Sequence, residues 1–211
     1  MKALIIFART PVKGKVKTRL KPYLSPGKIL RLYRSFIKDT VSACARIKGA
    51  DRLMGCTPSM DDPFFDELSG ACNLKRFNQK GETLKDRIVN AFEDHFKLGY
   101  KEIVLIGSDS PTMPPEYIRK AFSELKKNDL VIGPCFDGGL YLIGARRNKL
   151  RGVFRNIRLG TGEDVTVLLG KISRLNIRAF LLPFWYDVDT VEDLRFFRNH
   201  VKYLEGKRTG S

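Results

Sequence analysis

Residues 2–21 read KALIIFARTPVKGKVKTRLK, an apolar run that leads directly into a cation-rich loop. The run, residues 2–8, has the length and aliphatic composition of a buried strand. The loop, residues 9–21, holds six Lys or Arg residues and one glycine. Ser25 and Pro26 then supply an N-cap and a proline at the first helical position. A strand, a loop and a helix in this order predict the first unit of an α/β fold.

The same alternation continues along the rest of the chain. Further strands are expected at residues 51–57, 74–77, 102–107, 130–133, 140–144 and 178–182. Further helices are expected at residues 61–68, after Thr83, after Pro114 and Pro115, from Thr161 to Leu175, and after Thr190. Strands that alternate with helices indicate parallel crossovers, with helices on both faces of the sheet. We predict a single three-layer α/β/α domain with a mostly parallel central sheet over residues 1–205, followed by a frayed C-terminal tail, residues 206–211.

The composition excludes several other classes of protein. No stretch without Asp, Glu, Lys or Arg exceeds 8 residues, which is too short to span a bilayer. The apolar start ends at Arg9, too early for the core of a signal peptide. The four cysteines are widely spaced and the two histidines fall in helical patterns, which disfavours a zinc site, a disulfide framework and histidine-based catalysis. We expect a cytoplasmic protein with reduced thiols and no membrane partner.

The net charge of +16 is concentrated at one end of the chain. Residues 1–38 hold 11 Lys and Arg residues and no Asp or Glu, whereas the remainder has a balance of only +5. A concentrated block fits one site for an anionic ligand, because nucleic-acid tracks usually spread further. Lys offers point charges and Arg a bidentate fork for phosphate. The loop lacks the G-x-x-x-x-G-K-[ST] and G-x-G-x-x-G patterns, so a solvated basic loop is the alternative interpretation.

Carboxylates follow two of the later predicted strands. Asp109 comes directly after the strand at residues 102–107, and Asp187 and Asp189 follow the strand at residues 178–182. In open α/β sheets, ligands bind beyond the carboxyl ends of the strands, so these carboxylates are candidates to meet the basic loop. One or two carboxylates, with water and ligand phosphates, are enough to hold Mg²⁺. The alternative is that all three aspartates belong to turns or helix caps.

A third candidate segment is Asp137-Gly138-Gly139. Consecutive glycines permit the backbone to approach a ligand closely, and Asp137 is able to bind a hydroxyl. The same residues suit a hairpin turn, in which Asp-Gly occupies the positions with φ above zero. On these residues alone the turn is slightly favoured.

Four motifs together resemble a known family. They are F-A-R-x-P-x-x-G-x-V-K-T-R-L, G-x-D-S-P, D-G-G-x-Y-L-I-G and D-V-D-T-x-x-D-L, in this order between Leu4 and Leu194. The pattern is similar to small bacterial and archaeal GT-A type transferases, described as nucleotide-diphospho-sugar transferase-like, some of them labelled arsenosugar-biosynthesis glycosyltransferases. The K-T-R-L segment and the following helix also resemble the 2-phospholactate guanylyltransferases and, more distantly, the molybdopterin guanylyltransferases.

The resemblance implies roles for individual residues. Asp109 and Asp189 are expected to hold Mg²⁺ (or Mn²⁺), with Asp187 in reserve, and Lys17, Arg19 and Asp109 are expected to be catalytic. The residues expected to bind nucleotide phosphates are Arg9, Gly14, Lys15, Lys17, Thr18 and Arg19.

Other positions carry less defined expectations. Asp137, Gly138 and Gly139 are expected on the side of the sugar or the acceptor. Three residues, Gln79, Gly81 and Arg87, match a recurrent family segment to which no role is assigned. Lys13 stands where the family often has proline, and Ser108-Asp109-Ser110 lacks the strict D-x-D signature of glycosyltransferases.

These expectations lead to a Mg²⁺-dependent transferase that uses nucleotides. Nucleotidyl transfer from a nucleoside triphosphate to a small phosphate- or carboxylate-bearing acceptor is preferred, because a triphosphate has more charge to balance than a nucleotide sugar. Glycosyl transfer from a nucleotide sugar is the alternative. A non-catalytic nucleic-acid-binding module is weaker, because the charge is clustered and an aromatic-rich binding signature is missing.

Overall fold

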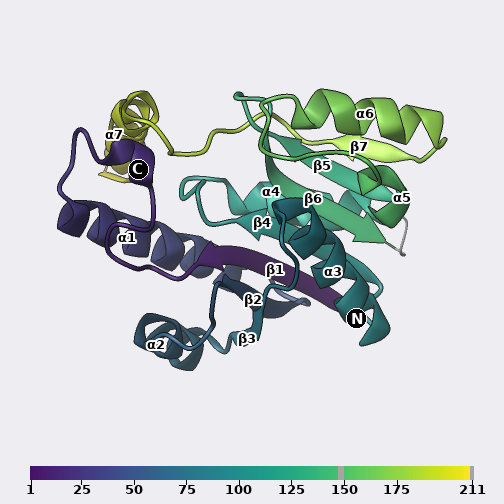
Figure 1. The fold of residues 1–211 in the computed structure, drawn as a ribbon, viewed down its shortest axis with the longest axis horizontal. Coiled ribbons are helices and arrows are strands. Elements are labelled where there is room, and N and C mark those ends of the chain that lie inside the picture. The colour runs from purple at the N-terminus through teal and green to yellow at the C-terminus, as the bar shows by residue number, and fades with distance from the viewer. Residues whose placement is uncertain (147–149, 210–211) are drawn as a thin grey trace.

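The computed structural model describes residues 1–146 and 150–209. Its seven strands are β1 Lys2–Arg9, β2 Asp51–Thr57, β3 Lys75–Asn78, β4 Glu102–Gly107, β5 Leu130–Pro134, β6 Leu140–Arg146 and β7 Ala179–Leu181. They form one sheet in the order β3-β2-β1-β4-β6-β5-β7 (Figure 1). Neighbouring strands are parallel except where β6 pairs with β4 and β5. The predicted mostly parallel sheet is therefore confirmed.

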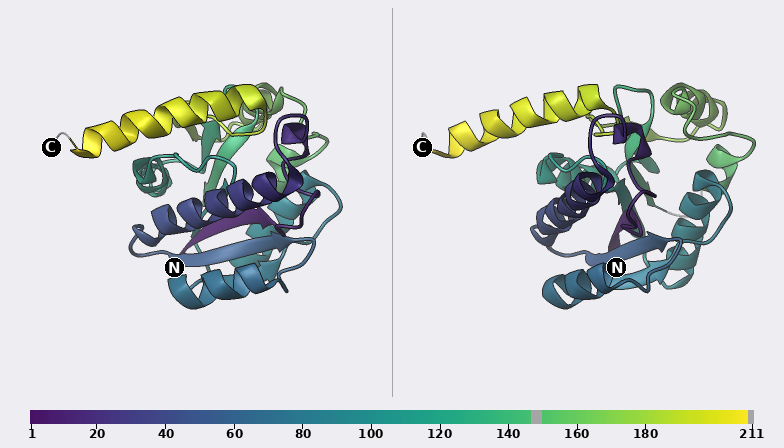
Figure 2. Two further views of the ribbon diagram at one scale, coloured as in Figure 1. Left: turned by 90° about the vertical axis from the view of Figure 1, so that its left-hand side faces the viewer. Right: turned by 60° about the vertical axis from the view of Figure 1, so that its left-hand side comes forward.

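Helices cover both faces of this sheet (Figures 1 and 2). They are the 3-10 helix η1 Thr18–Leu20 and the α-helices α1 Pro26–Ala45, α2 Pro63–Cys72, α3 Leu84–Lys97, α4 Pro115–Glu124, α5 Leu150–Phe154, α6 Asp164–Arg174 and α7 Val191–Thr209. Alternate side chains of β1 enter two separate cores, because successive residues of a strand point to opposite faces. Leu4 and Ile6 pack with α1, α2 and α4, whereas Ala3 and Ile5 pack with α3, α5 and α6. The three-layer α/β/α architecture is thus confirmed.

The last helix, α7, is attached mainly through its first half. The ring of Phe197 packs edge-on against that of Phe36 in α1, with centroids 5.2 Å apart. The other end of α7 extends away from the rest of the fold (Figure 2). No helix within residues 1–146 and 150–209 is long and apolar enough to cross a membrane.

The strand directions decide where the loops emerge. In the parallel pair β1 and β4, Phe7 is aligned with Gly107, so the segments that follow both strands leave the sheet at the same edge. β5 and β7 are also parallel, and β5 runs in the direction of β4 because β6 is antiparallel to both. The basic loop, the segment after β4 and the segment after β7 are therefore brought to one edge of the sheet.

Local capping chemistry explains the helix starts. The predicted capping box at Thr83 is present, because its hydroxyl accepts from Asp86 N at 3.2 Å while the Asp86 carboxylate accepts from Thr83 N at 3.2 Å. The helix expected from Thr161 instead begins at Asp164. The Asp164 carboxylate accepts hydrogen bonds from the backbone of Gly160 and Thr161, which places Thr161 in a turn before the helix.

Two further differences from the prediction concern helix extent. The short helix α5 was not predicted, since its five residues carry too little periodicity. Helix α7 continues as far as Thr209, so the tail predicted over residues 206–211 begins within a helix, and its fraying stays a prediction. Residues 210–211 lie outside the described residues.

Candidate active site

The cation-rich loop after β1 is anchored by two apolar side chains. Val16 and Leu20 are buried in the core on the α1 side of the sheet. Between them, Lys17 has φ 44° and ψ 47°, the left-handed region that side chains rarely adopt. Gly14 also has a positive φ, 78°, with open space around it. The anchors and the left-handed turn direct Lys17 inward while Lys15 stays exposed.

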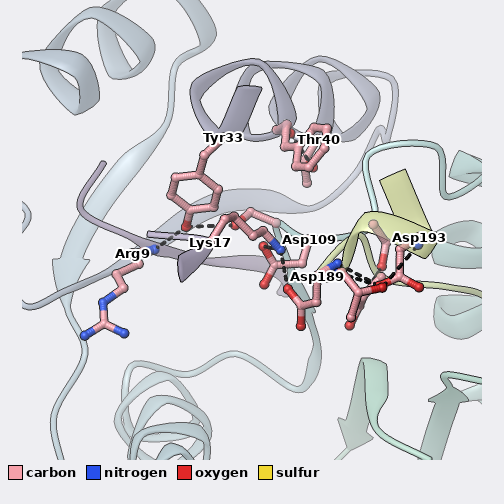
Figure 3. Close-up of polar contacts among 12 residues, drawn as sticks. Arg9, Lys17, Tyr33, Thr40, Asp109, Asp189 and Asp193 are labelled. Atoms are coloured by element: carbon pink, nitrogen blue, oxygen red, sulfur yellow. Dashed lines mark hydrogen bonds and ion pairs between the residues drawn. The ribbon is translucent and has the colours of Figure 1, made fainter. Parts of the chain in front are cut away.

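Lys17 lies between two of the predicted metal ligands (Figure 3). Its Nζ is 2.6 Å from Asp109 Oδ1 and 2.6 Å from Asp189 Oδ1. The Lys17 side chain is only 5% exposed, whereas those of Asp109 and Asp189 are 41% and 40% exposed. The structure thus brings together three of the predicted site residues. The Lys17 ammonium contacts these two carboxylates, whereas the sequence predicted that it would contact a nucleotide phosphate.

The electrostatics of this cluster favour the charged lysine. Burial lowers the pKa of Lys17, but Asp109 and Asp189 more than offset this effect, so the pKa is raised above its ordinary value. The Lys17 ammonium also lies 6.0 Å from the centroid of the Phe36 ring, within cation–π range. Lys17 therefore acts as a fixed counter-charge for two carboxylates that would otherwise repel each other.

Asp187 faces a different set of groups. Ser110 Oγ donates to Asp187 Oδ1, and Cys135 Sγ lies 3.5 Å from Asp187 Oδ2. Burial and the negative charge of Asp109 raise the pKa of Asp187 to about 7. Burial and the neighbouring Asp187 likewise raise the pKa of the Cys135 thiol. Asp187 belongs to the cluster, but its oxygens are engaged, which leaves Asp109 and Asp189 facing the basic loop.

Direct contacts join the two loops that carry the carboxylates. Val188 N donates to the backbone oxygen of Asp109 at 2.9 Å. The hydroxyls of Thr112 and Tyr186 lie 2.8 Å apart, and Tyr186 OH is also 2.8 Å from Nδ1 of His200 in α7. The spacing of the carboxylates is therefore held by the protein itself.

The start of α7 orients Asp189. The carboxylate of Asp193 accepts from the backbone N of Asp189 at 3.0 Å and from that of Thr190 at 2.7 Å. Thr190 Oγ1 accepts in return from Asp193 N at 3.2 Å. This reciprocal cap, predicted at Thr190, fixes the backbone from which Asp189 projects (Figure 3).

Tyr33 is a site residue that the sequence reasoning missed. Its place on the buried face of α1 made it look like a core residue. The structure shows Arg9 N donating to the Tyr33 hydroxyl at 2.8 Å, with Ser108 Oγ 3.4 Å away. Burial and the charge of Asp109 raise the pKa of Tyr33 to about 12. The available signal was the hydroxyl itself, because a buried tyrosine needs a hydrogen-bond partner.

These groups enclose a pocket of about 220 Å³ at the sheet edge. Its lining residues are Arg9, Lys15, Val16, Lys17, Thr18, Arg19, Tyr33, Asp109 and Asp189. All the predicted phosphate-binding residues except Gly14 therefore line it. The Arg9 guanidinium is directed away from Lys17 (Figure 3), so it is free to reach a ligand at the pocket mouth.

The segment Asp137-Gly138-Gly139 lies outside this pocket. It forms the predicted hairpin turn between β5 and β6, in which Asp137 Oδ1 accepts from Gly139 N at 2.9 Å. Gly138 has φ 84°, and a Cβ there would stand 1.7 Å from the backbone oxygen of Gly162. Glycine is required because the turn packs directly on the loop before α6. Its role beside an acceptor stays a prediction.

The recurrent segment around Gln79 stabilises the loop between β3 and α3. Gln79 Nε2 donates to the backbone oxygen of Gly55 at 2.7 Å. Arg87 donates to the backbone oxygens of Gly81 and Glu82 at 3.2 Å and 2.9 Å. These contacts give a structural role to residues for which the sequence provided none.

Known proteins share this arrangement of sequence and fold. A model of the family described as "Uncharacterized protein conserved in bacteria (DUF2064)" matches residues 40–161, more than half of the chain. The chain belongs to the DUF2064 family. A structure from Desulfovibrio desulfuricans G20, described as a nucleotide-diphospho-sugar transferase, is 36% identical to this DUF2064 protein, with a TM-score of 0.83 over 92% of this chain and 84% of the other.

More distant relatives are named for nucleotidyl transfer. The 2-phospho-L-lactate guanylyltransferase of Methanocaldococcus jannaschii is 24% identical over 92% of this chain and 81% of its own length. A cytidylyltransferase from Leptospira borgpetersenii shares the fold, with a TM-score of 0.63 at 16% identity over 96% of this chain and 87% of the other. The DUF2064 protein is thus a transferase with a nucleotidyltransferase-like fold, as the sequence motifs predicted.

Two carboxylates of this DUF2064 protein are able to hold a metal ion. The Oδ1 atom of Asp109 is buried and forms an ion pair with Lys17. Among the described residues, it accepts no hydrogen bond of normal geometry. In the described part of the chain, no group of three or more His, Cys, Asp or Glu side chains forms a complete metal cage. Two partly exposed aspartates fit Mg²⁺, which takes oxygen ligands and usually keeps waters and substrate phosphates in its shell.

Proposed function

We propose that this DUF2064 protein transfers a nucleotidyl group from a nucleoside triphosphate to a small acceptor in a Mg²⁺-dependent reaction. The observation that carries the proposal is the meeting of Asp109 and Asp189 at one pocket with the cations of the loop after β1. Phosphoryl chemistry of this kind depends mostly on positioning and on charge stabilisation, and this pocket offers both.

The loop cations are the groups that would bind the triphosphate. Lys15 and Arg19 are exposed in the pocket lining and are free to contact the β- and γ-phosphates. The same contacts would stabilise the negative charge that collects on the departing pyrophosphate. The neutral hydroxyl of Tyr33, at the inner wall of the pocket, is able to bind a phosphate oxygen.

Lys17 would hold the site ready before the substrate arrives. Its ammonium keeps the carboxylates of Asp109 and Asp189 at a fixed spacing. Its flexible four-carbon stem allows the ammonium to turn toward the phosphates when the carboxylates are otherwise neutralised. Bound Mg²⁺ would supply neutralisation of phosphate charge and orientation of the triphosphate. Asp109 and Asp189 are the residues that would hold it.

Calorimetric titration with the four nucleoside triphosphates, with and without Mg²⁺, tests this proposal. We expect one triphosphate to bind in a Mg²⁺-dependent way, and Asp109→Asn and Asp189→Asn each to weaken that binding by about tenfold or more. Asp61→Asn, at an exposed aspartate outside the pocket lining, is the matched control. Unchanged binding in both pocket variants would contradict the assignment.

Glycosyl transfer from a nucleotide sugar is the second candidate. It is favoured by the Desulfovibrio structure, which is described as a nucleotide-diphospho-sugar transferase at 36% identity. The two reactions leave different products. Release of pyrophosphate from a triphosphate identifies nucleotidyl transfer, and release of free nucleoside diphosphate from a nucleotide sugar identifies glycosyl transfer.

A further inference from the structure

A second cavity, of about 210 Å³, lies on the opposite side of Asp109. Most of its lining is apolar and lies on the α3 side of the sheet, with Phe7, Leu84, Ile88, Leu105 and Leu140 in strands or helices and Leu159 in the loop before α6. Among the described residues, no Lys or Arg contributes to this lining. Leu84 is 47% exposed, so the cavity borders solvent at the start of α3.

The polar end of this cavity is formed by carboxylates. Asp109, Asp187 and Asp164 all line it. The Asp164 carboxylate is occupied by the backbone N atoms of Gly160 and Thr161, at 2.8 and 3.1 Å. The oxygens of Asp187 are engaged by Ser110 and Cys135, so the group left to meet a ligand is Asp109, whose side chain is 41% exposed.

Asp109 lines both cavities, so the two cavities meet at this carboxylate. The first cavity, with Lys15 and Arg19, is on the α1 side, and the second is on the α3 side of the same carboxylate. In phosphoryl transfer, the attacking and leaving oxygens lie roughly in line on opposite sides of the reacting phosphorus. If pyrophosphate leaves into the cation-lined cavity, the acceptor must approach from the opposite side, where the second cavity lies.

We propose that the second cavity binds the acceptor, and that the acceptor is a small uncharged alcohol with an apolar body. This inference rests on the nucleotidyl transfer proposed above. It replaces the expectation of a phosphate- or carboxylate-bearing acceptor that the sequence suggested. Apolar walls suit an apolar body, and the carboxylate of Asp109 suits a group that donates a hydrogen bond.

Charge is the reason for excluding an anionic acceptor. A phosphate or carboxylate in this cavity would lie against Asp109 and Asp187, and the Lys17 ammonium that pairs with Asp109 is already shared with Asp189. Like charges placed together in a desolvated site are strongly unfavourable. Arg9, Lys15, Lys17 and Arg19 instead line the first cavity, on the proposed donor side.

The reaction balances without any further reactant. The hydroxyl oxygen of the acceptor forms a bond to the α-phosphorus, and the bond from that phosphorus to the bridging oxygen of the β-phosphate breaks. Pyrophosphate leaves with the bonding electron pair, and the hydroxyl proton is released to water. The products are a nucleotidyl ester of the alcohol and pyrophosphate.

Matched pairs of probes test the inference on the whole protein. The probes are n-butanol and n-butyl phosphate, benzyl alcohol and benzyl phosphate, and glycerol and glycerol 3-phosphate. Methyl signals of Leu84, Leu140 and Leu159 in NMR spectra report binding in the cavity. We expect butanol and benzyl alcohol to shift these signals at concentrations about tenfold or more below those their phosphate esters require. Tighter binding of the esters, or no shift with either alcohol, would overturn the inference.

A charge variant gives a second, independent measurement. Leu84→Arg places a cation at the cavity mouth and should bring the binding of benzyl phosphate to at least that of benzyl alcohol. Leu98→Arg, at the other end of α3 and 67% exposed, should leave the wild-type preference unchanged. If Leu84→Arg left the preference unchanged as well, the cavity would not be where the probes bind.

The donor side is measured separately, so that the two proposals fail in different ways. Calorimetry with Mg²⁺ and the four triphosphates reports on the first cavity alone. Absence of any triphosphate binding would contradict nucleotidyl transfer, while the alcohol preference would still be decided by the methyl signals. Triphosphate binding combined with a preference for phosphate esters would contradict the acceptor class alone.

Discussion

Lys17 Nζ donates a hydrogen bond of 2.6 Å to Asp189 Oδ1, although 172 residues separate them in the chain. The same ammonium lies 2.6 Å from Asp109 Oδ1. One buried cation therefore joins three segments, those that follow β1, β4 and β7. A divalent cation bound by these two carboxylates would need the oxygens that now face Lys17, so under the proposed function Lys17 and Mg²⁺ would compete for them.

Replacing Lys17 by methionine tests this competition. The change keeps an unbranched side chain, one atom shorter and without the ammonium, and leaves Asp109 and Asp189 without the Lys17 counter-charge. We expect the free energy of unfolding in EDTA to fall by about 1–3 kcal/mol, less than for a fully buried pair because both aspartates are partly exposed. Mg²⁺ should then stabilise Lys17→Met more than wild type, because no ammonium opposes it. Urea unfolding with EDTA and with Mg²⁺ measures both effects.

The control for this experiment is on the same loop. Lys15→Met removes an exposed charge that contacts neither aspartate, so its stability in EDTA should stay within about 0.5 kcal/mol of wild type. Equal stabilisation of wild type and Lys17→Met by Mg²⁺ would show that the ion does not bind between Asp109 and Asp189.

Asp187 predicts a pH dependence of stability. Burial and Asp109 raise its pKa in the folded state from 3.8 to about 7, so between these values the folded protein holds a proton that the unfolded chain has lost. The free energy of unfolding must therefore fall as the pH rises through this window and stay reduced above it. Asp187→Asn removes the free-energy cost of a buried negative charge. This variant should be more stable than wild type at pH 8, by on the order of 1–2 kcal/mol.

Thermal unfolding in EDTA across the pH range measures this difference. The gain from Asp187→Asn should shrink to near zero by about pH 3, where folded and unfolded wild type are both mostly protonated at this position. Asp61→Asn, at an exposed position, should show no such trend. A gain that stayed constant from pH 4 to pH 8 would mean that packing, and not ionisation of Asp187, is responsible.

The fold could be predicted because its signals are local. The KALIIFA run of β1, buried on both faces, marks a central strand without any knowledge of its neighbours. The caps at Thr83 and Thr190 depend on residues only three positions apart. The edge that carries the site followed from the rule that ligands bind at the carboxyl ends of the strands.

The details of the site could not be predicted, because they depend on contacts between distant segments. Burial of Val16 and Leu20 and a left-handed backbone turn Lys17 inward, and no sequence pattern specifies that combination. Asp187 and Asp189 are two residues apart, and only the family resemblance placed Asp189 first, with Asp187 in reserve. In the structure, the packing of Ser110 and Cys135 against Asp187 distinguishes the two.

The exposed cations of the loop should determine affinity for the triphosphate. We expect Lys15→Gln and Arg19→Gln each to weaken Mg²⁺-dependent triphosphate binding by about tenfold, since a hydrogen bond to a charged group is worth about 1.5–3 kcal/mol. Lys13→Gln, on the same loop but outside the pocket lining, is the matched control. Calorimetry at two salt concentrations measures the effect. If Lys13→Gln weakened binding as much, general attraction by the basic loop would account for it.

Gly138 should be far less tolerant of substitution than another glycine with the same backbone conformation. Gly138 and Gly160 have φ values of 84° and 82°, so a side chain strains both backbones equally. A Cβ at Gly138 would stand 1.7 Å from the backbone oxygen of Gly162, whereas a Cβ at Gly160 meets nothing within 4 Å. Gly160→Ala should therefore cost about 1 kcal/mol of unfolding free energy, and Gly138→Ala at least about 2 kcal/mol more. Urea unfolding of the two variants measures the difference. Equal losses would mean that the turn between β5 and β6 moves freely away from the loop before α6, and that its close packing beside the second cavity is not maintained in solution.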